Sequence, residues 1–158
     1  MASPGEVAGE LQGIAERLAD MRPIMEVLAA DVRTLMDDSF NQLRSPTGEP
    51  WRHLSEATES INPRRRGGRP ENDTGRLRGS MTAQADQHGV LFGSNTLYAA
   101  AQNFGNPNNR LFGGKLAPVP ARPFLPVNAN GVTLEPADWW DEKIRMVEHW
   151  IVTGEVTG

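Results

Sequence analysis

Residues 80–94, SMTAQADQHGVLFGS, decide the fold class of this chain. The stretch DQHG (86–89) forms turns readily, because Asp favours turns and Gly adopts backbone conformations closed to other residues. The apolar run VLF (90–92) follows at once and is typical of a short strand. The stretch therefore predicts a β-hairpin with strands over about 80–86 and 89–94.

The N-terminal part of the chain carries a helical pattern. Apolar side chains recur there at spacings of three and four residues, which is the period of one helix face. Pro23 interrupts this stripe, and a proline is tolerated only in the first turn of a helix. We therefore expect two helices at about 6–20 and 23–43, although the second could equally be a kinked continuation of the first. The stripe either packs on its own domain or meets a partner helix. Its members are Leu11, Ile14, Leu18, Met21, Met25, Leu28, Val32 and Leu35.

A short helix and a long loop are expected after the hairpin. Small and apolar residues on one face predict a helix over 96–104, with Ser94 or Asn95 as its N-cap. Residues 105–128 then contain five prolines, and proline lacks the N–H group that a central strand must donate. We expect this segment to be an extended loop with at most an edge strand near 119–125.

The C-terminal region predicts one more helix. Apolar residues align on one face over 137–153, Pro136 suits the first turn and Gly154 suits the end. With the hairpin, these helices make the class α+β. We expect a small, mainly antiparallel sheet packed by the N-terminal helices, a short middle helix and the C-terminal helix, with long loops rich in proline and glycine. At 158 residues the chain fits one domain over 1–158.

Charge alternates along the chain, although the formal net charge is only −4. Residues 1–43 carry eight acidic and three basic side chains, residues 44–126 carry six and eleven, and residues 127–158 carry six and two. Acidic, basic and acidic segments in series favour contact with a copy of the chain, or with another protein, through complementary patches. The net acidity argues against a dedicated nucleic-acid binder.

No catalytic, cofactor or metal site can be assembled from the sequence motifs. Cysteine is absent, and His53, His88 and His149 are too far apart to form a zinc-binding helix. No glycine-rich phosphate loop and no GxSxG nucleophile motif occurs. We therefore expect a protein that is not an enzyme and has no cofactor. No apolar run is long enough to span a membrane, so no membrane partner is expected.

Residues 61–75, INPRRRGGRPENDTG, form the most basic stretch and are expected to be a flexible loop. Three interpretations stay open for Arg64, Arg65, Arg66 and Arg69: a solvated loop, contact with an acidic surface of a neighbouring subunit, or contact with DNA phosphates. The last makes a small DNA-binding module the alternative function. No aromatic side chain is interleaved with these arginines, so stacking on single-stranded bases is not supported.

Several sequence phrases occur together in one order. They are Phe40, PTGEPWRHL (46–54), Thr58, TGRLRGSM (74–81), VLFGS (90–94), Tyr98-Ala99, NFG (103–105) and VPARPFL (119–125). This ordered set resembles the virion morphogenesis, or tail-completion, family of Mu-like tailed bacteriophages. The resemblance covers about residues 30–126. Each phrase alone is a weak signal, and the specificity comes from the ordered set, which ends in ARPFL.

The resemblance implies a structural protein of the virion, assembled in the cytoplasm of the bacterial host. Such proteins are similar to neck and tail-terminator subunits, which form rings between head and tail. We therefore expect the protein to form a ring. A hexamer is the first choice for the number of subunits, because terminator-like rings follow the six-fold tail. The expected partners are other copies of this chain, tail tube and sheath proteins, and head–tail connector proteins, with DNA passing through the ring.

Individual residues receive roles from these expectations. Trp51 is expected to anchor against the helices, and Arg122 to clamp a carboxylate or carbonyl groups, either within the fold or across a subunit boundary. Phe112 is expected in a loop tip with few neighbours to pack against. We therefore expect it to enter a pocket of a neighbouring subunit. The interface candidates are Arg64, Arg65, Arg66, Arg69, Phe112 and Arg122. The structural motif residues are Trp51, Leu77, Tyr98, Phe104, Pro123 and Phe124.

Overall fold

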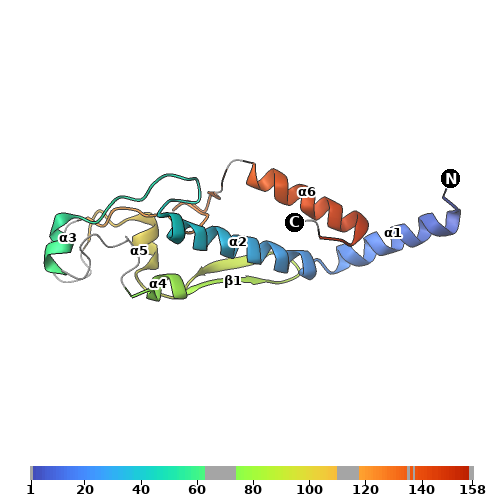
Figure 1. Ribbon diagram of the computed structural model, residues 1–158. Helices are drawn as coiled ribbons and strands as arrows, with labels where there is room; N and C mark the ends of the chain where they lie inside the picture. Colours follow the sequence, from blue (N-terminus) through green and yellow to red (C-terminus); the bar gives the residue numbers. More distant parts are fainter. Residues whose placement is uncertain (1, 63–73, 110–117, 135, 137, 157–158) are drawn as a thin grey trace. The chain divides into compact units, whose positions relative to one another are not determined.

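The computed structural model describes residues 2–62, 74–109, 118–134, 136 and 138–156 (Figure 1). Within these residues the chain forms six helices and a two-stranded antiparallel sheet, so the expected α+β class is confirmed. The helices are α1 Pro4–Ala19, α2 Arg22–Gln42, α3 Glu56–Ile61, α4 Arg76–Gly79, α5 Ala99–Phe104 and α6 Trp139–Thr153, and the strands are β1 Met81–Ala85 and β2 Val90–Ser94.

The residues group into two compact units. Unit 1 comprises Met1–Asp31, Ala83–Leu91 and Ala137–Gly158, and unit 2 comprises Val32–Thr82 and Phe92–Pro136. Both α2 and the hairpin contribute residues to each unit. The expectation of a single domain over the whole chain stays a prediction.

The two N-terminal helices are separate, as the position of Pro23 predicted. A capping box begins α1, in which the Glu6 N–H donates to Ser3 Oγ (3.3 Å) and the Ser3 N–H donates to Glu6 Oε2 (2.6 Å). The bond from the Ser3 N–H also lowers the pKa of the Glu6 carboxyl. The first helix ends before Asp20, and Pro23 occupies the second position of α2, where its missing N–H costs no helical hydrogen bond.

Unit 1 is built where α6 lies alongside the first half of α2 and the end of α1 (Figure 1). Ile24 of α2 packs with Met146 and Trp150 of α6 to form its buried core. Arg17 of α1 holds the last turn of α6, because its Nε donates to the Ile151 carbonyl (2.6 Å) and its Nη2 to the Val152 carbonyl (2.8 Å). Partly buried residues that pack against this core are Met21, Val27, Leu28, Val147 and Ile151.

The start of α6 differs from the prediction, whereas its end does not. Asp138, with a φ of 64°, precedes the first helical residue Trp139, so Pro136 lies outside the first turn and the predicted start at 137 is wrong by two residues. A left-handed residue directly before a helix sets a sharp change of chain direction that apolar periodicity does not record. Gly154 ends the helix with a φ of 79°, as predicted.

The hairpin forms where the turn sequence placed it. The Asp86 N–H donates to the Gly89 carbonyl (3.0 Å) and closes the turn. The Asp86 carboxylate accepts the backbone N–H groups of His88 (2.7 Å) and Gly89 (3.0 Å), and the first of these bonds lowers the pKa of Asp86. The carboxylate of Asp86 therefore stabilises the turn in its charged form.

The middle helix is shorter than predicted, whereas the described part of the loop after it fits the expectation of at most an edge strand. Helix α5 begins at Ala99 rather than at residue 96, because Ser94 Oγ accepts the Thr96 N–H (3.1 Å) and shapes the turn ahead of the helix instead of capping it. Within 118–134 no edge strand forms at 119–125. A single bridge joins Asn106 and Val119 there, with N–H to carbonyl distances of 2.9 and 3.0 Å.

Two short helices were not predicted. Ser55 caps α3 by accepting the Thr58 N–H (3.2 Å), and Glu56 and Glu59 lie near the positive end of the helix dipole. Helix α4 is a single turn that follows Gly75, whose φ is 73°. Both helices are too short to show an apolar period. Within the described segments, no helix combines the length and the apolar character needed to cross a membrane.

Candidate functional site

The sequence phrases that are far apart in the chain meet in unit 2. We call this group the motif cluster and define it as Phe40, Trp51, Asn103, Arg122 and Phe124. Its centre is aromatic: the ring of Phe40 lies 5.4 Å from that of Trp51, edge to face, and 5.3 Å from that of Phe124. All three rings are buried. Aromatic pairs of this geometry stabilise a fold by more than the burial of their apolar area alone provides.

Hydrogen bonds fix the closing phrase ARPFL against this centre. Trp51 Nε1 donates to the Pro123 carbonyl (2.8 Å), and the side-chain oxygen of Asn103 accepts the backbone N–H groups of Phe124 and Leu125, both at 2.8 Å. Asn103 is 1% exposed, and its bond to the Phe124 N–H is buried, whereas its bond to the Leu125 N–H is partly buried. The asparagine thus satisfies two backbone donors in a loop whose prolines prevent sheet pairing.

Arg122 lies inside its own subunit rather than on a free surface. The residue is 6% exposed, its Nε donates to the Arg52 carbonyl (2.9 Å) and its Nη2 to the His53 carbonyl (3.3 Å). Its backbone N–H donates to the Gln102 carbonyl (2.9 Å). Of the alternatives that the sequence left open, the structure shows carbonyl groups within the fold as partners of Arg122, and its role as a subunit contact stays a prediction.

Gly105 allows the motif cluster to close. Its φ is 80° and its ψ is 162°, a conformation that is almost confined to glycine. A Cβ atom at this position would lie 3.0 Å from the Ala121 N and 3.1 Å from the Val119 carbonyl oxygen. The NFG phrase therefore needs Asn103 for hydrogen bonding and Gly105 for the close approach of the chain.

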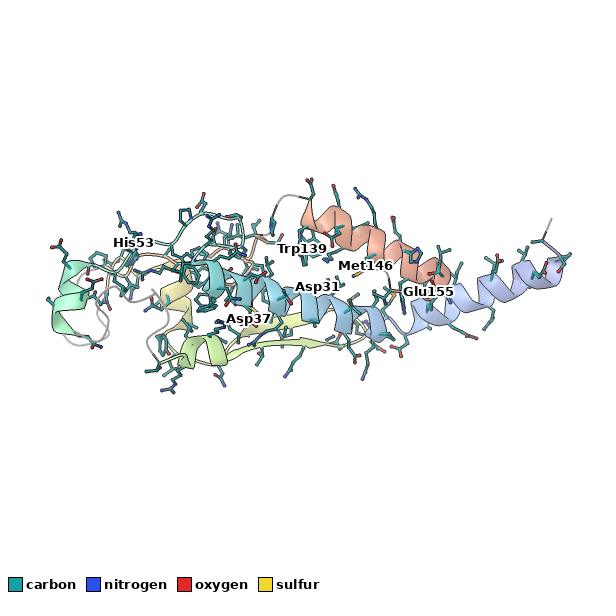
Figure 2. All side chains as sticks on the ribbon, in the orientation of Figure 1. Asp31, Asp37, His53, Trp139, Met146 and Glu155 are labelled. Carbon is teal, nitrogen blue, oxygen red and sulfur yellow. The ribbon has the colours of Figure 1, made fainter. Side chains whose placement is uncertain are left out.

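A second set of contacts joins the TGRLRGSM phrase to α2. Asp37 of α2, which is labelled in Figure 2, accepts a bond from Arg33 Nε (3.0 Å) on its own helix and from Arg78 Nε (3.0 Å) on α4. Arg33 also donates to the Met81 carbonyl. Leu77 and Met81 are buried beneath these ion pairs. Since the three charged side chains are about one third exposed, the ion pairs contribute modestly and the buried apolar residues carry most of the stabilisation.

Hydroxyl groups connect the same phrase to the second strand. Ser80 Oγ lies 2.7 Å from Ser94 Oγ, and Ser94 Oγ lies 2.9 Å from Thr96 Oγ1. Ser80 Oγ also donates to the Leu77 carbonyl (2.6 Å). The TGRLRGSM and VLFGS phrases are therefore neighbours in space, and their serines are the point of contact.

Other predicted residues lie outside these contacts. Tyr98 and Phe104 stand at the two ends of α5 and are partly exposed, at 36% and 38%. The remaining interface candidates, Arg64, Arg65, Arg66, Arg69 and Phe112, lie outside the described residues.

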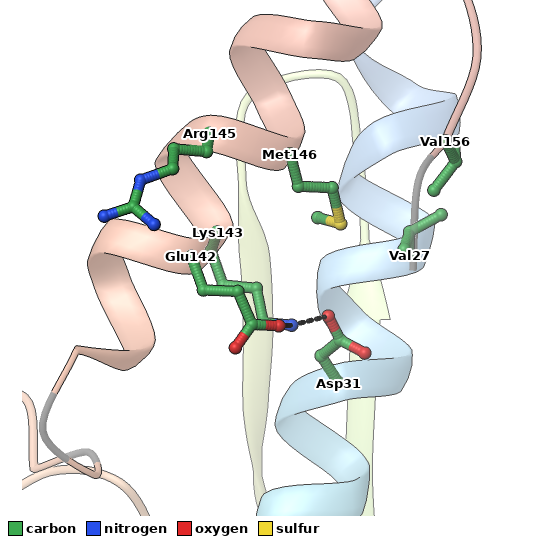
Figure 3. A pocket seen from close by; sticks show the side chains of 7 residues that line it. All are labelled: Val27, Asp31, Glu142, Lys143, Arg145, Met146 and Val156. Carbon is green, nitrogen blue, oxygen red and sulfur yellow. Dashed lines mark hydrogen bonds and ion pairs between the residues drawn. The ribbon is translucent and has the colours of Figure 1, made fainter.

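Unit 1 contains an ion pair that the sequence did not indicate. Lys143 Nζ of α6 lies 2.8 Å from Asp31 Oδ2 of α2 and 2.9 Å from Glu142 Oε1 (Figure 3). Burial disfavours the ammonium form, but the two carboxylates outweigh it and raise the pKa of Lys143. Asp31 and Lys143 are distant in sequence, so no local pattern could have paired them. An open pocket of about 450 Å³ surrounds the pair, lined by Val27, Asp31, Glu142, Lys143, Arg145, Met146 and Val156.

The described residues hold no group of three or more His, Asp or Glu side chains that could bind a metal ion. The pocket of unit 1 presents a lysine that is already paired with two carboxylates. The contacts of the motif cluster are directed at its own backbone. The contacts described in the two units therefore hold parts of the chain to one another.

A family model decides the identity of the chain. The model of the phage virion morphogenesis family matches residues 5–135, a range that contains the whole motif cluster. The chain belongs to this family. The Mu-like prophage FluMu G protein 2 of Haemophilus influenzae is 28% identical over 120 residues, which is 76% of each chain. No solved structure matches the chain.

The resemblance read from the ordered phrases is confirmed, and so is a structural role in building a phage virion. The contacts of the motif cluster explain why the phrases occur together. Ring contacts and hydrogen bonds join the ARPFL phrase to Phe40, Trp51 and Asn103. A change in one phrase would therefore leave buried residues of the other phrases without their contacts. Helix α6 lies beyond the matched range.

Proposed function

We propose that this virion morphogenesis protein forms a ring in the neck of the phage, where it completes the tail and joins it to the head. The ring is a hexamer that follows the six-fold tail. Its partners are the tail tube and sheath proteins on one side and the head–tail connector proteins on the other. DNA passes through the ring, and the protein performs no catalysis.

The division of charge between the two units supports this proposal most directly. The segments of unit 1 carry twelve acidic and four basic side chains, a net charge of −8, whereas those of unit 2 carry eight and twelve, a net charge of +4. Folding thus gathers both acidic ends of the chain, together with the turn of the hairpin, into one unit. The net charges of the two units differ by more than the net charges of the three sequence segments do.

A closed ring requires two different surfaces on each subunit. In a head-to-tail contact one face of a copy meets another face of the next copy, and rotation closes the ring. An acidic unit and a basic unit provide such a pair, because opposite charges attract across the contact while like faces repel each other. This arrangement favours contact between unlike units, which is the contact that a head-to-tail ring repeats.

Restoration of virions from their parts tests the proposal. A lysate of the encoding phage that lacks this chain is expected to accumulate filled heads and separate tails in electron micrographs. Addition of the purified protein is expected to restore joined particles. Normal numbers of joined, infectious particles in the lysate without the chain would contradict the proposal.

A further inference from the structure

Helix α1 presents an apolar stripe with nothing described on it. We define the α1 stripe as Val7, Leu11, Ile14 and Leu18, which recur at spacings of four, three and four and so share one helix face. Leu11 is 61% exposed, Leu18 53% and Val7 42%. None of the sixteen residues of α1 is buried.

The apolar spacing of the stripe recurs in the sequence from Met21 into α2, and there the residues pack in the core that α6 shares. Met21 and Leu28 keep the same spacing, and both pack against the core that Ile24 forms with Met146 and Trp150 of α6. Arg17 of α1 bonds to the last turn of α6, and Gly154 ends α6 beside it. The exposed residues of the stripe on α1 are therefore apolar, like the residues that pack in the core with α6.

Helix α1 is a weak helix on its own. A helix of about this length is marginal in water even when its composition is favourable. Gly9 and Gly13 lie in its interior, where glycine is among the least favourable residues. The capping box supports its first turn and Arg17 its last, and the turns between them lack tertiary support. Such a helix gains most from a partner that covers its apolar face.

We infer that the α1 stripe docks on unit 2 of a second copy of this chain. The inference rests on the proposed ring and names one of its two contact surfaces. Helix α1 carries Glu6, Glu10 and Glu16 against a single basic residue, Arg17. Pairing two α1 helices along their stripes would bring the flanking Glu10 side chains toward acidic residues of the other copy, whereas the basic unit 2 of the next copy attracts them. Among the described residues of unit 2, the exposed bases Arg44, Arg52 and Arg76 outnumber the exposed acids Glu49 and Glu56.

Serine substitutions on two faces of α1 test the apolar part of the inference. Val7→Ser with Leu11→Ser removes two members of the stripe, and Ala8→Ser with Gln12→Ser places the same side chains one position further round the helix. Sedimentation of the full chain over a range of concentrations measures self-association. We expect the stripe variant to associate about a hundredfold more weakly than the wild type, and the control within about twofold.

Charge reversal distinguishes unit 2 from a second α1 as the occupant. Glu10 flanks the stripe, being three residues from Val7 and four from Ile14, whereas Glu16 faces away from it. Docking on unit 2 predicts that Glu10→Lys weakens association about fivefold at low salt and Glu16→Lys does not. Pairing of two α1 helices predicts that Glu10→Lys strengthens association, because it removes repulsion.

The outcomes separate this inference from the proposed ring. If the stripe variant assembles as the wild type does, or if Glu10→Lys strengthens association, the inference is wrong while the ring stands. If the wild type itself stays monomeric at every concentration, the ring and the inference both fail. Tryptophan fluorescence and the melting temperature confirm that each variant folds, and no residue changed here is buried.

Discussion

The side-chain oxygen of Asn103 accepts the backbone N–H of Phe124 at 2.8 Å, across 21 residues of chain. The same oxygen accepts the N–H of Leu125. Phe124 is fully buried, so water cannot replace the asparagine. This one oxygen therefore holds the end of a loop that is rich in proline against α5, and it links the NFG phrase to the ARPFL phrase.

Asn103→Ala should destabilise the protein by about 2–4 kcal/mol, because it leaves two backbone donors without an acceptor. Denaturation by urea, followed by tryptophan fluorescence, measures this change. Asn106→Ala is the matched control. The Asn106 side chain accepts only an exposed N–H, that of Asn108, among its described bonds, and we expect about 0.5 kcal/mol there. Equal losses in the two variants would contradict the role assigned to Asn103.

Trp51→Phe should cost about 1–3 kcal/mol. The change keeps an aromatic ring beside Phe40 but removes the Nε1 donor and leaves the Pro123 carbonyl without it. Trp140→Phe, at an exposed position on α6, should change stability by less than about 0.5 kcal/mol. A Trp51→Phe variant as stable as the wild type would show that the hydrogen bond contributes nothing.

Gly105→Ala and Gly131→Ala separate backbone strain from steric contact. Both glycines have a positive φ, at 80° and 77°, but a Cβ on Gly131 meets no atom within 4 Å. We expect about 1 kcal/mol for Gly131→Ala and about 3 kcal/mol or more for Gly105→Ala, as judged by urea denaturation. A cost at Gly105 no larger than that at Gly131 would mean that the chain does not approach it closely.

Acidification should loosen the hairpin turn through Asp86. The folded state lowers the pKa of Asp86, so its contribution is present above the unfolded value of about 3.9 and is lost as the pH falls through the lowered value. Hydrogen exchange at the His88 and Gly89 amides, compared between the wild type and Asp86→Asn, reports this loss. Protection in the wild type should fall below about pH 4 relative to that variant. Identical pH profiles would contradict the assignment.

Local signals were enough to find the larger elements. The helices near 6–20 and 23–43 follow from apolar spacing and Pro23, and the hairpin follows from DQHG before an apolar run. Where a signal was short or ambiguous, the prediction failed. Ser55 and two early acids mark α3, but the helix spans less than two turns. Ser94 has the type of an N-cap residue and uses its hydroxyl in a turn instead.

The contacts of the motif cluster could not be derived from local pattern. The bonds from Asn103 to Phe124 and from Trp51 to Pro123 join distant residues, and nothing in the spacing of either pair reveals them. The ordered phrases indicated that these residues belong together without showing how. The same holds for Asp31 and Lys143, whose ion pair depends on the packing of α6 on α2. Charge counts along the sequence indicated complementary patches. In the folded chain most of each acidic end segment belongs to one unit and most of the basic segment belongs to the other.

Electron microscopy of the purified wild-type chain at low salt tests the central claim most directly. The claim is that copies of this protein assemble head to tail through an acidic and a basic unit. Class averages are expected to show closed rings of six subunits, each of 17.3 kDa, that dissociate when the salt concentration is raised. A field of single subunits at low salt, over all concentrations that can be imaged, would contradict the account.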